Sequence, residues 1–190
     1  MANRNSQGFR LIPAGRLGGG PSIEGQGKYK IDAGHSTTIY NGECVKISSG
    51  YVVGGNGSAA NIVGVLNGIF FNAADTLKPT FSNFYKATIT PANSEDTTAF
   101  VIDDPFQQYV VAADAATGVT TFLETYDMNT SAGSDTTGKS SSTLDIGTTS
   151  ADGKQFRMLR SAEDPENEDA TAVRHSVVVV SNLNSFNGHN

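Results

Sequence analysis

The sequence contains no tryptophan, only one cysteine, and no apolar run long enough to cross a membrane. Because Cys44 is alone, no disulfide can form within the chain and no cysteine-based metal site can be built. The longest aliphatic run, residues 177–180, is far shorter than the roughly 20 residues that a membrane-spanning helix needs. The first residues also lack the apolar segment of a secretory signal. These absences predict a protein that is made in a cytosol and does not act in a membrane.

The sequence also lacks the residue patterns that usually accompany catalysis. Residues 133–140 match the phosphate-binding pattern G-x-x-x-x-G-K-[ST], but neither the preceding strand nor the following helix that this site requires is present. The three histidines have no metal-binding spacing, and no G-x-S-x-G motif occurs. The acidic run at residues 163–169 lacks the spacing of a calcium loop and is interpreted as a solvated turn, although an ion there stays an open alternative. We therefore expect no enzymatic activity, no cofactor and no metal.

Charged residues make up only 17% of the chain, below the usual quarter. After residue 30 the sequence shows short runs of β-branched and aromatic residues separated by turn residues, which is typical of short strands. Asn41-Gly42 and Asn67-Gly68 are typical of tight hairpin turns. Residues 109–113 suit a strand or a weak helix, and residues 129–153, mostly Ser, Thr and Gly, suit a long exposed loop or hairpin. The expected fold is mainly β with little helix: a small antiparallel barrel or sandwich. The other expected strands are residues 37–40, 43–47, 51–53, 62–66, 69–71, 85–90, 100–102, 156–159 and 177–181.

Charge is distributed unevenly along the chain. Residues 1–30 contain five basic residues and one acid, whereas residues 31–190 contain 8 basic and 18 acidic residues. This division predicts a flexible, basic, glycine-rich N-terminal arm (1–30) on a single β-rich body (31–190). An arm that only keeps the chain soluble is the alternative, but this one also contains apolar residues. The residues expected to contact a partner are Arg4, Phe9, Arg10, Leu11, Ile12 and Arg16. An acidic protein surface is the expected partner; no specific nucleic-acid binding is expected, because the body has no basic patch with interleaved aromatics.

Two blocks of the sequence resemble small structural proteins of tailed-bacteriophage particles. Residues 39–53 and 62–68 are similar to a barrel pattern found in such proteins. Residues 156–160, 164–167 and 177–182 are similar to the C-terminal end of head-associated proteins. The resemblance implies a capsid decoration (cement) protein, a homotrimer that binds the major capsid protein lattice and stabilises the shell. It would be made in the bacterial cytoplasm and located on the outside of the virion, with its arm reaching neighbouring subunits.

Two alternatives to this function stay open at the level of sequence. The polar loop and the tyrosines permit a carbohydrate- or receptor-binding β-sandwich, although tryptophan, the usual platform for sugars, is missing. A tail or head-to-tail connector component is the second alternative, since these proteins also use small β barrels. Sequence alone leaves the oligomeric state, the contacted capsid surface and the strand topology undetermined.

Overall fold

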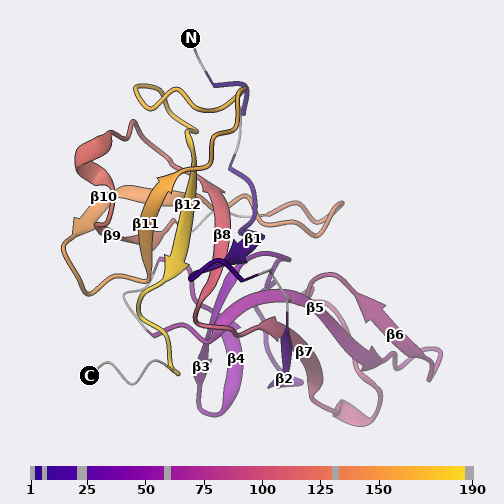
Figure 1. Cartoon of the computed structure of the whole chain (residues 1–190). Coiled ribbons are helices and arrows are strands. Elements are labelled where there is room, and N and C mark those ends of the chain that lie inside the picture. Colours follow the sequence, from indigo (N-terminus) through magenta and orange to yellow (C-terminus); the bar gives the residue numbers. More distant parts are fainter. Residues whose placement is uncertain (1–2, 6–7, 21–24, 58–60, 130–132, 187–190) are drawn as a thin grey trace.

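The computed structural model describes residues 3–5, 8–20, 25–57, 61–129 and 133–186, which form two antiparallel β-sheets (Figure 1). The mainly β fold with little helix is confirmed, and it is a sandwich. Strands β2 and β4 stand at the two ends of the second sheet, and no ladder between described residues joins them, so this sheet is not a closed barrel.

The first sheet contains six strands, and its order departs strongly from the chain order. In spatial sequence these are β1 (Ile12–Arg16), β8 (Gln107–Ala112), β12 (Ser176–Ser181), β11 (Phe156–Ser161), β9 (Thr125–Met128) and β10 (Leu144–Ser150). The predicted strand at 177–181 is confirmed, and β12 lies between β11 and β8 with all six residues buried.

In the second sheet the longest strand, β5, lies at the centre, and β2 lies at one end. Its order is β2 (Gln26–Ile31), β7 (Thr97–Ile102), β5 (Gly64–Asn72), β3 (Cys44–Ser48) and β4 (Tyr51–Gly54). Strand β6 (Pro79–Ser82) pairs with the C-terminal half of β5, beyond the part that pairs with β3. Helical structure among the described residues is limited to two 3-10 turns, Ala92–Ser94 and Val119–Thr121.

Two apolar cores hold these layers. The first core lies between the sheets, where Val65 and Ile102 of the second sheet meet Tyr109, Phe156 and Val179 of the first. The second core lies on the opposite face of the second sheet, where Ile39 and Tyr85 close over the strands. The thiol of Cys44 is fully buried in the first core, as expected for a small hydrophobic residue. Because the second sheet is covered on both faces here, its strands contain long apolar stretches.

Strand β5 contains an irregularity where the sequence predicted a turn. Its pairing with β7 shifts register between Leu66 and Gly68, which indicates a β-bulge at Asn67. Residues 62–66 and 69–71 are therefore not two strands joined by an Asn67-Gly68 hairpin, and that prediction was wrong. The backbone carbonyl of Asn67 accepts a hydrogen bond from Asn41 Nδ2 at 2.7 Å, so an interaction with a neighbouring loop satisfies the irregular backbone.

Much of the expected N-terminal arm is part of the sandwich. Strand β1 pairs with β8, strand β2 pairs with β7 along its whole length, and Leu11 is only 1% exposed in the first core. Asn3 and Arg4 contact the acidic turn: the Arg4 backbone N–H donates to the Glu166 carbonyl at 3.1 Å. The prediction of a flexible arm is thus wrong for residues 12–16 and 26–30. The parts of that arm at residues 1–2, 6–7 and 21–24 lie outside the described residues.

The Ser/Thr/Gly-rich segment at residues 129–153 is also more ordered than predicted. Residues 144–150 form strand β10, and Ser140, Ser142 and Thr143 before it are buried. Residues 133–140 form a turn that a bond from the Ser134 N–H to the Lys139 carbonyl closes at 2.9 Å. A strand follows this turn, and Lys139 is exposed, so the geometry of a phosphate-binding loop is not present there.

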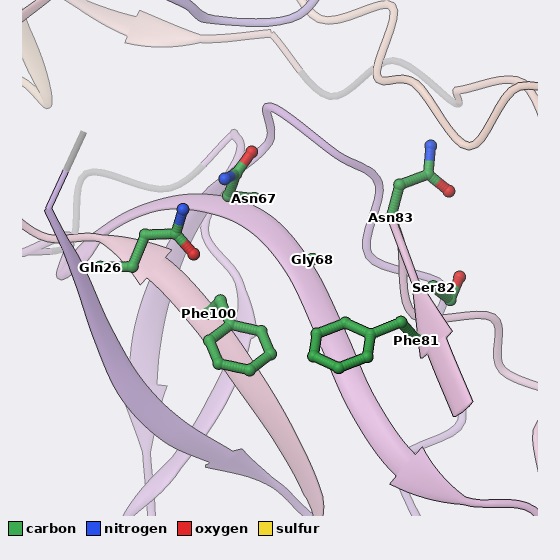
Figure 2. Close-up of a pocket in the computed structure, with 7 residues that line it drawn as sticks. All are labelled: Gln26, Asn67, Gly68, Phe81, Ser82, Asn83 and Phe100. Atoms are coloured by element: carbon green, nitrogen blue, oxygen red, sulfur yellow. The ribbon is translucent and has the colours of Figure 1, made fainter. Parts of the chain in front are cut away.

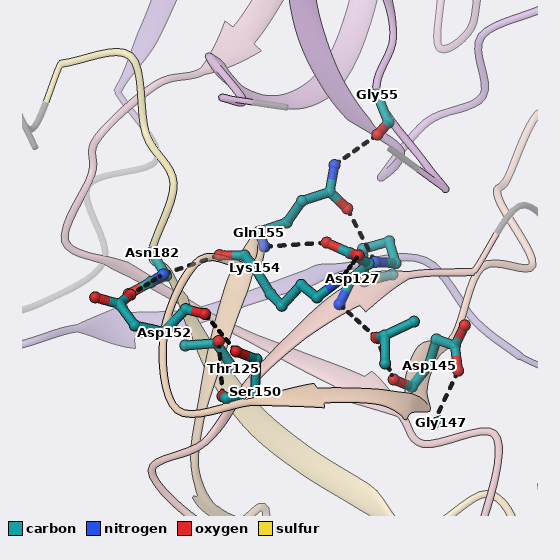
Figure 3. Close-up of polar contacts among 12 residues, drawn as sticks. Gly55, Thr125, Asp127, Asp145, Gly147, Ser150, Asp152, Lys154, Gln155 and Asn182 are labelled. Carbon is teal, nitrogen blue, oxygen red and sulfur yellow. Dashed lines mark hydrogen bonds and ion pairs between the residues drawn. The ribbon is translucent and has the colours of Figure 1, made fainter. Parts of the chain in front are cut away.

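A buried polar network links the two sheets (Figure 3). The Gln155 side chain is completely buried; its Oε1 accepts from the Met128 N–H at 2.9 Å, and its Nε2 donates to the Gly55 carbonyl at 2.6 Å. Next to it, Lys154 Nζ lies 2.9 Å from Asp127 Oδ2. Gln155 therefore supplies, in one side chain, a donor to the loop after β4 and an acceptor to strand β9.

Candidate functional site

Three of the predicted contact residues lie together at a surface cleft. Arg10, Leu11 and Ile12 line a hollow of about 150 Å³, and Asn41 and Asn67 belong to the same lining. The cleft is formed where the chain entering β1 passes the loop before β3 and the bulge of β5. Three of the six residues that were predicted to contact a partner therefore line the same cleft.

The residues around this cleft differ in what they present to solvent. Ile12 is 39% exposed, whereas Leu11 is buried in the first core and presents almost no surface to a partner. The Arg10 guanidinium donates to Asn41 Oδ1, and its stem packs on Gly42, where an added Cβ would lie 2.3 Å from the Arg10 Cβ. Gly42 also has a φ of 76°. Glycine is therefore needed here for two reasons: a Cβ would clash with Arg10, and this positive φ is unfavourable for other residues.

The remaining predicted contact residues lie outside the cleft and interact within the chain. Arg16 Nε lies 2.9 Å from Asp104 Oδ2, and its guanidinium lies 5.6 Å from the centroid of the Phe106 ring. Arg4 pairs with the carboxylate of Glu166, and Phe9 is half-buried. The guanidinium groups of Arg4, Arg10 and Arg16 thus each have a partner in this chain.

A second hollow adjoins the first at Asn67. It has a volume of about 310 Å³, and an aromatic pair forms its apolar part (Figure 2). The rings of Phe81 and Phe100 are nearly parallel, 10° apart, with centroids separated by 5.6 Å. Phe81 is 72% exposed, which is unusual for a side chain of this size. We call this hollow the aromatic pocket; its lining residues are Gln26, Asn67, Gly68, Phe81, Ser82, Asn83 and Phe100.

Strand register explains why phenylalanines gather on this surface. Ile102 pairs with Val65, Phe100 pairs with Gly68, and two residues further along Phe70 occupies the same face. Ile102 and Val65 face the first sheet and belong to the first core, whereas Phe100 and Phe70 are only half-buried on the same face of the second sheet. Because the bulge at Asn67 adds one residue, it moves Phe70 onto this face and Ile69 into the second core.

The sequence prediction missed the aromatic pocket. Phe100 was included in an apolar run, and residues 79–82 were not expected to form a strand. A signal existed in Thr80-Phe81-Ser82, where an aromatic residue alternates with hydroxyl residues and pairs opposite Phe70. Finding the pocket from sequence would also have required the pairing of β5 with both β6 and β7.

Glu43 lies beside the cleft and has an altered acidity. Its Oε2 accepts from the Tyr40 N–H at 2.9 Å, and an added Cβ at Gly54 would lie 3.0 Å from its Oε1. Burial raises the pKa of Glu43 to about 7, and the bond from Tyr40 opposes this rise only in part. The carboxyl is therefore largely protonated in the folded protein at mildly acidic pH.

The substitution Glu43→Gln is expected to stabilise the protein at pH 8, by about 2 kcal/mol, and to have little effect at pH 4. The unfolded chain releases this proton near the ordinary pKa of 4.5, whereas the folded chain keeps it until about pH 7. The wild type therefore loses stability as the pH rises through this window, and glutamine does not. Urea unfolding across the pH range measures the difference; Glu95→Gln, at an exposed position, is the control and is expected to change stability by less than about 0.5 kcal/mol. A pH-independent difference at Glu43 would contradict the prediction.

The chain is an antiparallel β-sandwich with two adjoining hollows on its surface. No family model, no curated protein and no solved structure matches the chain. Within the described residues, no three His, Cys, Asp or Glu side chains are grouped so that they could hold a metal ion. No helix in this part of the chain has the length and apolar character needed to span a membrane.

Proposed function

We propose that this chain is a non-enzymatic structural protein of a tailed-phage particle, which binds the outside of the capsid and stabilises the shell. In this proposal it acts as a homotrimer on the lattice of the major capsid protein. The contact surface is the cleft at Arg10 and Ile12 with the adjoining edge strand β1. The resemblance of the sequence to phage head proteins supports the assignment to a phage particle. The cleft is the surface at which we propose the contact with the capsid.

The observation that carries the proposal is the position of Ile12. It is an exposed aliphatic residue on β1, whose only ladder partner among the described residues is β8. An edge strand offers unpaired backbone groups, to which a partner can add a strand, and an exposed aliphatic side chain adds apolar contact. Arg10, whose guanidinium bonds the neutral side chain of Asn41, keeps a positive charge beside this edge, which complements an acidic partner surface.

Substitution of Ile12 by aspartate is expected to abolish binding to capsids. The carboxylate would require desolvation in the interface and would remove the apolar contact. Co-sedimentation of the purified full chain with tailed-phage capsids that lack this protein measures the effect. Immunogold labelling of intact particles from the source would show whether the chain covers the heads.

Ile47→Asp is the matched control for this experiment. Ile47 is 42% exposed and also lies on a strand, but it belongs to β3 in the second sheet, away from the proposed contact. This variant is expected to bind capsids like the wild type. Unchanged binding by Ile12→Asp, or gold confined to a vertex or tail, would refute the decoration role proposed here.

A further inference from the structure

We infer that the aromatic pocket binds a neutral sugar ring. This inference goes beyond the proposed function, because it concerns a small ligand at a site that differs from the capsid contact at Ile12. It rests on three features of the pocket: its aromatic platform, the amide groups beside it, and the uncharged character of its lining.

The platform is the pair formed by Phe81 and Phe100. Their rings lie side by side above β5 at Gly68, and Figure 2 shows them with their faces turned in the same direction. The face of an aromatic ring carries partial negative charge and attracts the weakly positive C–H groups on one side of a pyranose. Two phenylalanines thus provide the apolar surface for which a single tryptophan is more often used.

The polar groups next to the platform are amides. Figure 2 shows Gln26, Asn67 and Asn83 along one side of the ring pair, with their side chains above the strands. An amide both donates and accepts hydrogen bonds, and so does a sugar hydroxyl. Asn83 Nδ2 donates to the Thr137 carbonyl at 2.8 Å, which holds this side chain in place and leaves its Oδ1 as an acceptor. Within the described part of the chain, no hydrogen bond engages the side-chain amides of Gln26 or Asn67, so no described residue competes with a ligand for them.

The lining and the size of the pocket favour a neutral small molecule. None of its lining residues is charged. Lys28 is on the neighbouring position of β2, opposite Phe100, and is exposed rather than part of the lining. The volume of about 310 Å³ is at the lower end of the range for small-molecule sites, which suits one or two sugar rings rather than a large ligand. A neutral hexopyranose matches the apolar platform and the amides together.

The test is binding of the full chain to an array that contains neutral and acidic glycans, followed by calorimetric titration with the neutral sugars that bind. Phe81→Ala is expected to weaken this binding about tenfold, because it removes half of the platform. Phe81→Trp is expected to retain binding, since it keeps an aromatic face at the same position. Phe81 is highly exposed, so these variants should fold.

Phe106→Ala is the matched control, because Phe106 is also exposed but lies against Arg16, outside the pocket. Sugar binding that is weakened about tenfold in Phe81→Ala and unchanged in Phe106→Ala and Ile12→Asp supports the inference. Binding of acidic glycans alone, no binding at millimolar sugar, or binding unchanged by Phe81→Ala overturns it. These outcomes are independent of capsid binding, so the failure of one proposal is distinguishable from failure of the other.

Discussion

Deletion of residues 1–20 is expected to destroy the cooperative fold of this protein rather than to remove a dispensable arm. The deletion takes strand β1 from the edge of the first sheet and Leu11 from the first core. It also removes the Gly15 carbonyl, which accepts from Nε2 of the completely buried Gln107 at 2.8 Å. Loss of one large buried aliphatic side chain costs about 3 kcal/mol. Loss of the Gln107–Gly15 hydrogen bond costs about 1 kcal/mol more, since Gln107 Nε2 keeps a second acceptor in the Gln108 carbonyl at 2.9 Å. Together with the loss of the β1–β8 ladder, these losses reach the lower end of the total stability of a typical domain, which is about 5–15 kcal/mol.

Thermal unfolding followed by circular dichroism measures this effect. Two variants separate the contributions: Leu11→Ala tests the core contact alone, and deletion of residues 1–5 removes the contacts of Asn3, Arg4 and Asn5 with residues 166–173. We expect Leu11→Ala to cost about 3 kcal/mol and the short deletion to cost less than about 2 kcal/mol. A melting curve of the long deletion that matches the full chain would show that residues 1–20 behave as an arm after all.

The substitution Gln155→Leu is expected to destabilise the protein by about 3–5 kcal/mol. Leucine has a similar size but leaves the Met128 N–H and the Gly55 carbonyl buried without their partners. Each such group carries a penalty of about 1–3 kcal/mol, and the apolar side chain would also lie beside the Asp127 carboxylate. The backbone of Gln155 is part of the same junction, since its carbonyl accepts from the Asn182 N–H at 2.8 Å.

Urea unfolding compares this variant with Gln26→Leu, the same substitution at an exposed position. The control is expected to change the free energy of unfolding by less than about 0.5 kcal/mol. A cost below 1 kcal/mol for Gln155→Leu would mean that water replaces both hydrogen bonds, and that the network in Figure 3 contributes little to joining the sheets.

The strands that sequence analysis found and those it missed differ in their place in the sheets. Strands β3, β8, β11 and β12 were predicted because they contain β-branched and aromatic residues. Strands β1, β2 and β10 were missed, and all three are at sheet edges; β4, the remaining end strand, was predicted because Tyr51, Val52 and Val53 give it the same aromatic and β-branched pattern. An edge strand contacts water along one side and needs few apolar residues, so it lacks the pattern that prediction uses. Of the five strands predicted between residues 37 and 71, two merged into β5 because the Asn67-Gly68 signal marks a bulge, and two are β3 and β4. The strand predicted at residues 37–40 was wrong, since only Ile39 pairs there, in an isolated bridge with Tyr85.

Strand β9 shows a different reason for failure. All four of its residues are buried, yet Thr125 and Asp127 are polar and gave no strand signal. Their polarity is compatible with burial only because distant residues supply partners: Thr125 Oγ1 donates to the Ser150 carbonyl at 2.9 Å, and Asp127 pairs with Lys154. The aromatic pocket depends on long-range register in the same way. Residues near one another in sequence, such as Arg10 and Ile12, were easier to place on one surface.

The central position of β12 determines when this fold can form during synthesis. Strand β12 comes last among the strands, yet it separates β8 from β11 in the middle of the first sheet (Figure 1). Until residues 176–181 have left the ribosome, β1 and β8 cannot join the remaining strands of that sheet, and their apolar faces stay incomplete. All strands of the second sheet lie within residues 26–102, so they leave the ribosome before β12. While residues 103–181 are being made, the nascent chain therefore contains all strands of the second sheet together with unpaired strands of the first, and unpaired strand edges of this kind favour misassembly.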